Sequence, residues 1–305
     1  MLCQLIILTG PTAVGKTATA IHLAQQIGAE IISADSRQLY RYMDIATAKP
    51  SPAEQGAVAH HGLDLLNPDE IYSAGAFVRF ARQALADIWS RGKAALVVGG
   101  TGLYIQAFLD GLWADEGQAA QVREELQARL GREGLEALYG ELGRLDPVAQ
   151  AQVARRDTQR VLRTLEIATT VSQRAFSWDP MPVKPPAFCL CRPRGEQNQR
   201  IDERVEAMAA QGLVAEAERL VGLGYHRGTR AMQSLGYEEL LDYLESRCTL
   251  DQALAQVRTR TRQFAKRQLT WFRKDRRYRW LDLSRWGNGG AVERVLLELR
   301  NQKGL

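Results

Sequence analysis

The chain has 305 residues, of which 45% are hydrophobic and 25% are charged. These proportions are ordinary for a folded protein, so they exclude a disordered, collagen-like or coiled-coil chain. The length predicts two domains, or one domain with a large insertion. No apolar run approaches the roughly 18 residues that span a membrane, and no secretory signal is recognisable. The four cysteines form no Cys-x-x-Cys pair, which predicts a cytoplasmic protein without a disulfide scaffold or a zinc site.

Positive charge is concentrated in one segment. The net charge is +5, but residues 258–279 alone contain ten Arg or Lys and one acid. Of the 40 basic residues in the chain 33 are arginines, and the planar guanidinium suits phosphates and base edges. The segment therefore favours a polyanionic partner such as nucleic acid. A solvated helix face would account for the same charges.

The first part of the chain alternates short apolar runs with helical spacing. The apolar runs predict buried strands at residues 2–8, 31–32 and 94–98. Helical periodicity predicts helices at residues 18–27, 73–91 and 103–109. This alternation predicts an α/β fold in which helices flank a parallel sheet.

The pattern changes after Trp113. Residues 114–170 show helical periodicity and no strand-like run, and the prolines between 180 and 186 mark a linker. A last strand at 188–191 is expected to complete the sheet, followed by helices over 200–278. One of these helices has an apolar seam at Leu254, Val257, Thr261, Phe264, Gln268 and Trp271. We therefore expect a core of residues 1–112 and 182–305, interrupted by a mostly helical inserted domain at 113–181.

Residues 10–17 match the phosphate-binding pattern G-x-x-x-x-G-K-[ST] between a predicted strand and a predicted helix. In such a loop, backbone N–H groups and the helix N-terminus face phosphate oxygens. The Lys16 ammonium can reach the phosphate chain, and the Thr17 hydroxyl can bind Mg²⁺. The predicted diphosphate-binding residues are Gly10, Pro11, Thr12, Ala13, Val14, Gly15, Lys16 and Thr17.

The phosphate-binding loop at residues 10–17, called the cradle below, does not by itself identify the reaction. Kinases and NTP hydrolases usually carry a second strand that ends in an Mg²⁺-supporting Asp. Here the strand at 94–98 is followed by Gly99-Gly100-Thr101-Gly102 instead. Asp35 follows the strand at 31–32, and ligands gather at the carboxyl ends of such strands. Asp35 could hold Mg²⁺, accept a proton from a nucleophile, or cap the following helix.

Four further segments follow the cradle in chain order. They are residues 32–40 (Ile-Ser-Ala-Asp-Ser-Arg-Gln-Leu-Tyr), 98–104 (Val-Gly-Gly-Thr-Gly-Leu-Tyr), 159–163 (Gln-Arg-Val-Leu-Arg) and 263–272 (Gln-Phe-Ala-Lys-Arg-Gln-Leu-Thr-Trp-Phe). With the cradle, they resemble the tRNA dimethylallyltransferase family of bacterial type over nearly the whole chain. The stretch Ser-Ala-Asp-Ser-Arg-Gln is highly specific. The sequence departs from the usual family pattern at Ala46, Gly62, Arg155 and Val171.

The resemblance implies a fold similar to P-loop kinases and a defined reaction. A dimethylallyl group would pass from dimethylallyl diphosphate to N6 of the adenosine immediately 3′ of the anticodon, in tRNAs that read codons beginning with U. The cradle, Lys16 and Mg²⁺ would stabilise the leaving diphosphate. Asp35 would be the general base, and Thr101 would hydrogen-bond near the reacting atoms. The resemblance also implies that the enzyme acts as a monomer.

It implies tRNA contacts in three regions. Around the adenine these are Asp35, Ser36, Arg37, Gln38 and Thr101. In the insertion they are Arg123, Gln159, Arg160, Val161, Leu162 and Arg163, with Arg156 expected on the same helix face as Gln159, Arg160 and Arg163. In the basic segment the residues expected at phosphates are Arg262, Lys266, Arg273, Arg276 and Arg277. Trp271 and Phe272 would either stack on bases or pack inside the protein.

Two other functions fit parts of the sequence. A small-molecule or nucleotide kinase would use the same cradle for ATP. However, this sequence lacks the strand-end acid of such a kinase, and a kinase function leaves the basic segment unexplained. A non-catalytic RNA-binding module would explain the basic segment, but not a phosphate cradle accompanied by Asp35.

Overall fold

The computed structural model describes residues 5–113, 118–170 and 176–302. The chain divides into two compact units, one made of Met1–Leu109 with Pro182–Leu305 and the other of Asp110–Met181. The domain boundaries expected from the sequence, after residues 112 and 181, remain a proposal. Every helix in the described part of the chain is too short or too polar to cross a bilayer.

The first unit is built on six parallel strands in the order β3-β2-β4-β1-β7-β8. The strands are β1 (Leu5–Thr9), β2 (Ala29–Ser33), β3 (His60–His61), β4 (Ala94–Gly99), β7 (Ala187–Cys191) and β8 (Tyr278–Asp282). Because neighbouring strands run in the same direction, β1, β2 and β4 end at one edge of the sheet. Residues 10–17 begin directly after β1, and Asp35 and Thr101 come two residues after the ends of β2 and β4.

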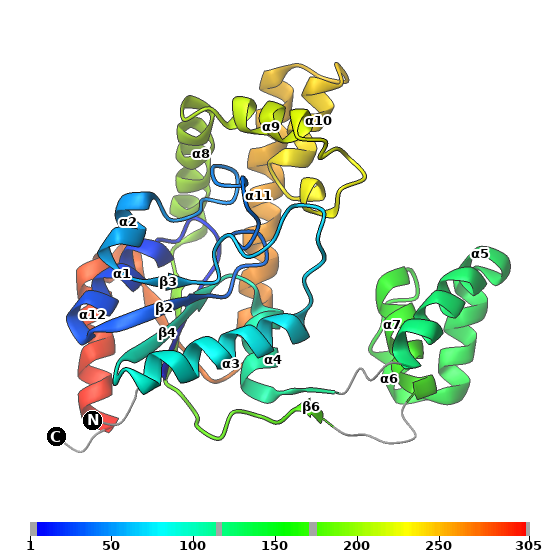
Figure 1. Cartoon of the computed structure of the whole chain (residues 1–305), viewed down its shortest axis with the longest axis horizontal. Coiled ribbons are helices and arrows are strands. Elements are labelled where there is room, and N and C mark those ends of the chain that lie inside the picture. Colours follow the sequence, from blue (N-terminus) through cyan, green and yellow to red (C-terminus); the bar gives the residue numbers. More distant parts are fainter. Residues whose placement is uncertain (1–4, 114–117, 171–175, 303–305) are drawn as a thin grey trace. The chain divides into compact units, whose positions relative to one another are not determined.

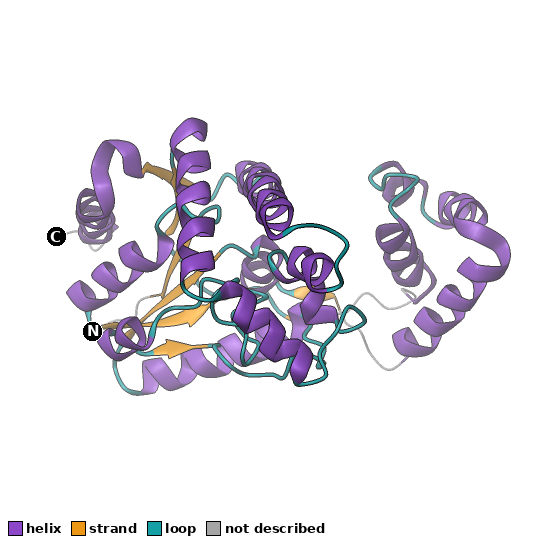
Figure 2. Ribbon diagram, turned by 90° about the horizontal axis from the view of Figure 1, so that it is seen from above, coloured by secondary structure: helices purple, strands orange, loops and turns teal. Residues whose placement is uncertain are grey.

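Helices cover both faces of the sheet (Figures 1 and 2). On one face α1 (Lys16–Ile27) packs against α12 (Leu283–Gln302), and both share a core with alternate residues of the strands, such as Ile6 and Leu8. α3 (Ala74–Ser90) packs against β2 and β4. The other helices of this unit are α2 (Pro52–Ala57), α4 (Gly102–Asp110), α8 (Arg194–Ala210), α9 (Leu213–Gly222), α10 (Tyr237–Leu244) and α11 (Leu250–Arg273), with a 3-10 turn at Arg230–Gln233.

The second unit is mainly helical. Its elements are α5 (Gln118–Leu145), α6 (Pro147–Ala151), α7 (Thr158–Thr170) and a short antiparallel pair, β5 (Leu112–Trp113) and β6 (Phe176–Trp178). α5 is interrupted at Gly134, whose φ of 80° and ψ of 163° are not helical. The two halves of α5 and α7 enclose a small apolar core of Leu126, Leu138, Leu142, Val161 and Leu165.

The parallel sheet flanked by helices is confirmed, but both of its edge strands, β3 and β8, were missed. The strand at 188–191 was expected to complete the sheet, whereas β8 pairs with it in parallel and forms the edge. Helical structure was expected up to residue 278, whereas α11 ends at Arg273. The sequence signal of β8 is weak because the strand has five residues and exposes two of them, Arg279 and Trp280.

The predicted seam of α11 is confirmed at Val257, Thr261 and Gln268, which are buried, and is off by one residue at its other three positions. Phe264 and Trp271 are 39% and 38% exposed, while Phe272 is fully buried and packs edge-on against Tyr278. The buried residues of the helix are Ala253, Val257, Thr261, Ala265, Gln268 and Phe272. Spacings of three and four fit two adjacent stripes of a helix, so periodicity alone cannot choose between them. Phe272 is therefore a packing residue, and base stacking remains open only to Trp271.

At the amino end of β2, a buried glutamate collects several positive groups. The Glu30 side chain is 4% exposed and pairs with Arg91, with Lys93 at 2.8 Å and with His61 at 2.7 Å. The hydrogen bond from Arg91 is the main reason that the pKa of Glu30 lies well below its usual range, against the opposing effect of burial. This network lies at the other end of β2 from Asp35.

Replacing this carboxylate tests its contribution to stability. Glu30→Gln should lower the free energy of unfolding at pH 7 by about 1–3 kcal/mol, because hydrogen bonds to charged groups are lost. The native pKa is lowered, so the contribution is complete above the unfolded-state pKa of about 4.3 and declines as the pH falls below it. Denaturant unfolding of both proteins at pH 7 and pH 3 measures this, and a difference that does not shrink at pH 3 would contradict it.

Candidate functional site

The phosphate-binding loop, residues 10–17, connects β1 to α1 at the carboxyl edge of the sheet. Gly10 and Gly15 have φ values of 150° and 113°, which residues other than glycine rarely adopt. A Cβ on Gly10 would also lie 2.6 Å from the Leu190 carbonyl oxygen of β7. Both glycines of the pattern are thus required by backbone conformation, and the first also by close approach to the sheet.

Side chains of α8, and one just before it, hold the carbonyl oxygens of this loop. The donors and their backbone acceptors are Gln197 to Thr12, Arg200 to Ala13 at 3.0 Å, and Arg192 to Val14 at 2.9 Å. Within the described residues, the N–H groups of Ala13, Val14 and Gly15 have no protein acceptor. Because these free donors lie at the start of α1, they form a cradle for an anion.

Lys16 folds back over the cradle. Its ammonium donates to the carbonyl oxygens of Gly10 at 3.0 Å and Pro11 at 2.8 Å. Burial lowers the pKa of Lys16 to about 8, although the nearby Asp35 carboxylate opposes the shift. Lys16 therefore lies at the cradle and close enough to Asp35 to feel its charge, and the ammonium is poorly solvated until an anion binds.

Arg204 of α8 is a second cation at the cradle that the sequence analysis missed. Its Nη1 lies 3.4 Å from the Thr12 hydroxyl. Burial, with the neighbouring charge of Arg200, lowers the pKa of Arg204, and Arg204 in turn lowers the pKa of Lys16. The only sequence signal is the spacing of Arg200 and Arg204 on one helix face, which a solvated helix shows equally.

Asp35 follows β2 and organises a turn. Its Oδ1 accepts the backbone N–H of Arg37 at 2.9 Å and that of Gln38 at 3.4 Å. The capping alternative considered from the sequence therefore holds in altered form, since residues 36–39 form a turn and not a helix. Oδ2 has no hydrogen-bond partner among the described residues, so one oxygen anchors the turn and the other can meet a substrate.

Thr101 follows β4 and is tied to the same turn. Its N–H donates to the Ala34 carbonyl at 3.2 Å, and its Oγ1 accepts the Ser36 N–H at 3.0 Å. The two hydroxyls of Thr101 and Ser36 are 3.4 Å apart. The structure thus brings Asp35, Ser36 and Thr101 together, next to Lys16.

Three glycines around Thr101 allow other segments to come close. A Cβ at these positions would overlap the neighbour of each: Ala34 beside Gly99, Gln268 beside Gly100 and Trp271 beside Gly102. The Gly-Gly-Thr-Gly sequence is therefore a contact surface for β2 and α11, where a kinase would place an acid.

Gln268 of α11 joins the cradle to this segment. Its Oε1 accepts the Thr12 N–H at 2.8 Å, and its Nε2 donates to the Gly100 carbonyl at 2.9 Å. Gln268 is 7% exposed, so both polar atoms are buried and paired. The sequence placed Gln268 in a packing seam but not in this role, because contacts between residues so far apart in the chain leave no spacing signal.

Arg37 and Gln38 are held differently. Gln38 Nε2 donates to the carbonyl oxygens of Thr47 at 3.3 Å and Ala48 at 3.0 Å, and its Oε1 accepts the Ser33 hydroxyl at 3.2 Å. Arg37 makes no ion pair with any described residue and is half-buried. Gln38 is therefore fixed in place, while the Arg37 guanidinium is available to a ligand.

In the second unit, two of the predicted arginines converge on one acid. The Glu166 side chain is 3% exposed and contacts Arg123 at 2.7 Å and Arg163 at 2.5 Å. The arginines keep 54% and 45% of their side chains exposed. Gln159 and Arg160, at the start of α7, are exposed as well. This arrangement leaves a basic surface despite the buried carboxylate.

Other sequence expectations for α7 are corrected. Val161 is fully buried in the apolar core of the unit, so the tRNA contact implied for this residue stays a prediction that its side chain does not support. Leu162 is half-buried and packs against the same core. Arg156 precedes α7, which begins at Thr158, so Arg156 does not share its face. Val171, one of the departures noted above, lies outside the described residues.

Part of the positive charge in the basic segment is neutralised by the protein itself. Arg262 pairs with Asp202 at 2.5 Å and Arg277 with Asp275 at 2.6 Å. The basic residues that are exposed and form no ion pair within the described residues are Lys266, Arg267, Arg273, Lys274 and Arg276. The phosphate contacts expected of the segment thus have fewer free cations than its composition indicates.

The described residues contain no cluster of three or more His, Cys, Asp or Glu side chains that could hold a metal ion. Thr17, in the first turn of α1, has a hydroxyl that makes no hydrogen bond with the described residues. This donor set suits Mg²⁺, which commonly uses few protein oxygens together with phosphate oxygens and water. It does not suit a metal that needs an all-protein site.

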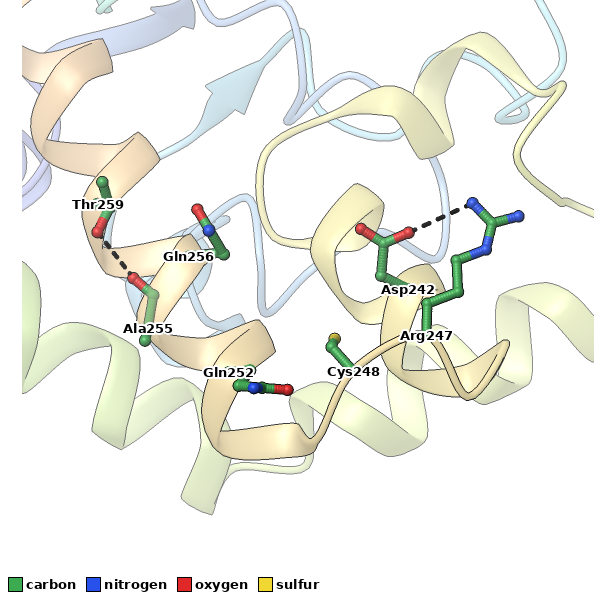
Figure 3. Close-up of a pocket in the computed structure, with 7 residues that line it drawn as sticks. All are labelled: Asp242, Arg247, Cys248, Gln252, Ala255, Gln256 and Thr259. Atoms are coloured by element: carbon green, nitrogen blue, oxygen red, sulfur yellow. Dashed lines mark hydrogen bonds and ion pairs between the residues drawn. The ribbon is translucent and has the colours of Figure 1, made fainter.

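A separate hollow of about 490 Å³ lies between α10 and the start of α11 (Figure 3). Polar side chains line much of it, including Asp242, Arg247, Cys248, Gln252 and Gln256. It contains none of the residues predicted to bind diphosphate or tRNA. The candidate site is therefore the edge of the sheet described above.

Comparisons with known proteins identify relatives over almost the whole chain. The family model for IPP transferase matches residues 38–275, and that for isopentenyl transferase matches residues 3–63. A tRNA dimethylallyltransferase 2 from Syntrophus aciditrophicus is 45% identical over 285 residues, covering 92% of each chain. A tRNA dimethylallyltransferase from Carboxydothermus hydrogenoformans is 40% identical over 302 residues, covering 97% of each.

Solved structures of similar proteins point to the same family. The tRNA isopentenylpyrophosphate transferase from Bacillus halodurans superposes with a TM-score of 0.72 at 34% identity, covering 99% of this chain and 98% of that one. A eukaryotic dimethylallyltransferase acting on tRNA superposes with a TM-score of 0.77 at 26% identity, covering 96% of this chain and 78% of that one. From the motifs, the geometry of the sheet edge and these matches, the chain belongs to the tRNA dimethylallyltransferase family.

Proposed function

We propose that the protein transfers a dimethylallyl group from dimethylallyl diphosphate to N6 of the adenosine immediately 3′ of the anticodon, in tRNAs that read codons beginning with U. It would do so in the cytoplasm and as a monomer. The observation that carries the proposal is the junction of an anion cradle with Asp35 and Thr101 at one sheet edge. The names of the relatives, and the eukaryotic neighbour acting on tRNA, support the same reaction.

The cradle would bind the diphosphate as leaving group. The allylic C–O bond breaks and the new C–N bond forms, so negative charge grows on the diphosphate. The free N–H groups of Ala13, Val14 and Gly15 meet this charge, with the ammonium of Lys16 and the guanidinium of Arg204 beside them. The Thr17 hydroxyl would hold Mg²⁺, which would supply further neutralisation of this charge.

Asp35 would take the proton that the amine loses. The exocyclic amine of adenine is a very weak acid, so deprotonation accompanies C–N bond formation. The Asp35 Oδ2 is suited to this because Oδ1 already anchors the turn. The Thr101 hydroxyl, whose long contact to Ser36 is easily exchanged, would hydrogen-bond the adenine. The target base must first leave the anticodon-loop stack, at a cost of a few kcal/mol.

A kinase reaction is not favoured by the same observations. The end of β4 carries glycines that touch β2 and α11, and no carboxylate follows it. The chain also belongs throughout its length to a transferase family. The site offers ATP a phosphate-binding loop, but it lacks the carboxylate that usually supports Mg²⁺ in phosphoryl transfer.

Asp35→Asn tests the base. It keeps an oxygen that can hold the turn but cannot accept a proton, so kcat should fall by about 10²–10⁴-fold while both KM values change little. Steady-state transfer of labelled dimethylallyl to tRNA, with each substrate varied in turn, measures kcat and both KM values. A variant with more than a tenth of the wild-type kcat would rule out Asp35 as the base.

Lys16→Ala tests the division of the site into two halves. Loss of the ammonium should lower turnover by about 100-fold or more, because charge on the leaving group is less stabilised. Binding of tRNA, measured by filter retention without the prenyl donor, should stay within about twofold of wild type. An equal loss of tRNA affinity would contradict this separation.

The pH profile tests the state of Lys16. Since its pKa is lowered to about 8, the free enzyme loses the ammonium as the pH rises through 8. The value of kcat/KM for dimethylallyl diphosphate should therefore decline above about pH 8. In Lys16→Arg this decline should disappear below about pH 10, whatever the absolute rate, because the guanidinium stays charged. An unchanged decline in Lys16→Arg would assign it to another group.

A further inference from the structure

A buried carboxylate far from the cradle holds a segment beside the adenine side of the site. Glu216 of α9 is 4% exposed. It accepts the backbone N–H groups of Asp44 at 3.0 Å, Ile45 at 2.9 Å and Ala46 at 3.3 Å. It also accepts the Tyr237 hydroxyl of α10 at 2.6 Å. Glu216 forms no ion pair within the described residues, so these four hydrogen-bond donors are the partners of its carboxylate oxygens.

The held segment, residues 43–49, has little regular structure of its own. A buried carboxylate is costly unless it is hydrogen-bonded, so the four donors tie this segment and α10 to Glu216. Lys49 adds a second anchor, because its ammonium donates to the Tyr40 carbonyl at 2.8 Å and pairs with Asp44 and Asp64. The segment is thus held from both sides, by α9 and by residues 40 and 64.

The same segment fixes Gln38. The carbonyl oxygens of Thr47 and Ala48 accept both bonds from Gln38 Nε2. The Gln38 N–H in turn donates to Asp35 Oδ1. A continuous path of hydrogen bonds therefore runs from Glu216 through segment 43–49 and Gln38 to the turn that presents Asp35. No step of this path involves the cradle, which is held by Arg192 and by Gln197 and Arg200 of α8.

We infer that Glu216 is a positioning residue for the tRNA substrate: through segment 43–49 it sets Gln38 and the 36–39 turn for the incoming adenosine. This inference rests on the proposed function. It assigns Glu216 to one of the two substrates, since the diphosphate half of the site has separate supports. A merely structural role would lower the amount of folded enzyme without distinguishing tRNA from the prenyl donor.

Glu216→Gln is the direct test, and Glu30→Gln is its matched control. Both replace a buried glutamate that accepts several hydrogen bonds. Glu30, however, lies at the end of β2 away from Asp35. In Glu216→Gln the side-chain amide would face backbone N–H groups. We expect the KM for a tRNA anticodon stem-loop to rise about tenfold or more, with the KM for dimethylallyl diphosphate within about twofold. Glu30→Gln should lower the melting temperature and leave both KM values unchanged.

A double-mutant cycle shows whether the effect passes through Gln38. If it does, Glu216→Gln added to Gln38→Met should raise the tRNA KM by less than about twofold over Gln38→Met alone. Tyr237→Phe removes one of the four donors and should give a smaller rise, which keeps the test valid if Glu216→Gln folds poorly. An unchanged tRNA KM in both Glu216→Gln and Tyr237→Phe, equal changes in both KM values, or additive effects with Gln38→Met would overturn the inference.

Failure of the proposed function gives a different result. A wild-type protein that transfers no prenyl group to tRNA would refute that function. A wild-type protein that does transfer it, with Glu216→Gln showing normal tRNA KM, would refute only the role of Glu216.

Discussion

The site depends on how closely the ends of β2 and β4 approach each other. Gly99 lies against the Ala34 carbonyl with no room for a side chain, and Ala34 exchanges backbone hydrogen bonds with Val98 and Thr101. Since Asp35 follows Ala34 and Thr101 lies two residues after Gly99, this approach decides where their side chains lie. A Cβ at position 99 would push apart the two groups proposed to meet the adenine, even though glycine itself contacts no substrate.

The rest of the site is a set of supports that keep two halves separate but adjacent. On the diphosphate half, Arg192, Gln197 and Arg200 donate to carbonyl oxygens of the loop. The N–H groups of Ala13, Val14 and Gly15 have no acceptor among the described residues. On the adenosine half, Asp35 and Thr101 share one turn. Gln268 is the direct hydrogen-bonded link between them. This organisation explains how a loop pattern shared with nucleotide-binding proteins can serve a prenyl diphosphate, because chemistry is decided by what stands next to the cradle.

Much of this could be predicted from the sequence, and the failures have physical reasons. The cradle, Asp35 and the strands that precede each of them are local features, because neighbouring residues determine their conformation. Arg204 and Gln268 act on residues more than a hundred positions away, so no local pattern reveals them. β8 was missed because a short edge strand with exposed Arg279 and Trp280 lacks the apolar signal of a buried strand. Val161 was assigned to tRNA by resemblance, whereas helical periodicity directs its side chain toward a core, where the structure buries it.

The most direct measurement is a transfer assay with two labels. The protein would be incubated with Mg²⁺, unmodified tRNA that reads codons beginning with U, and dimethylallyl diphosphate labelled in the prenyl group and the diphosphate. A parallel reaction would replace the prenyl donor with labelled ATP. The account predicts one prenyl group on N6 of the adenosine 3′ of the anticodon for each diphosphate released, and no tRNA-dependent use of ATP. Phosphate transfer or release from ATP, without prenylation of tRNA, would contradict it.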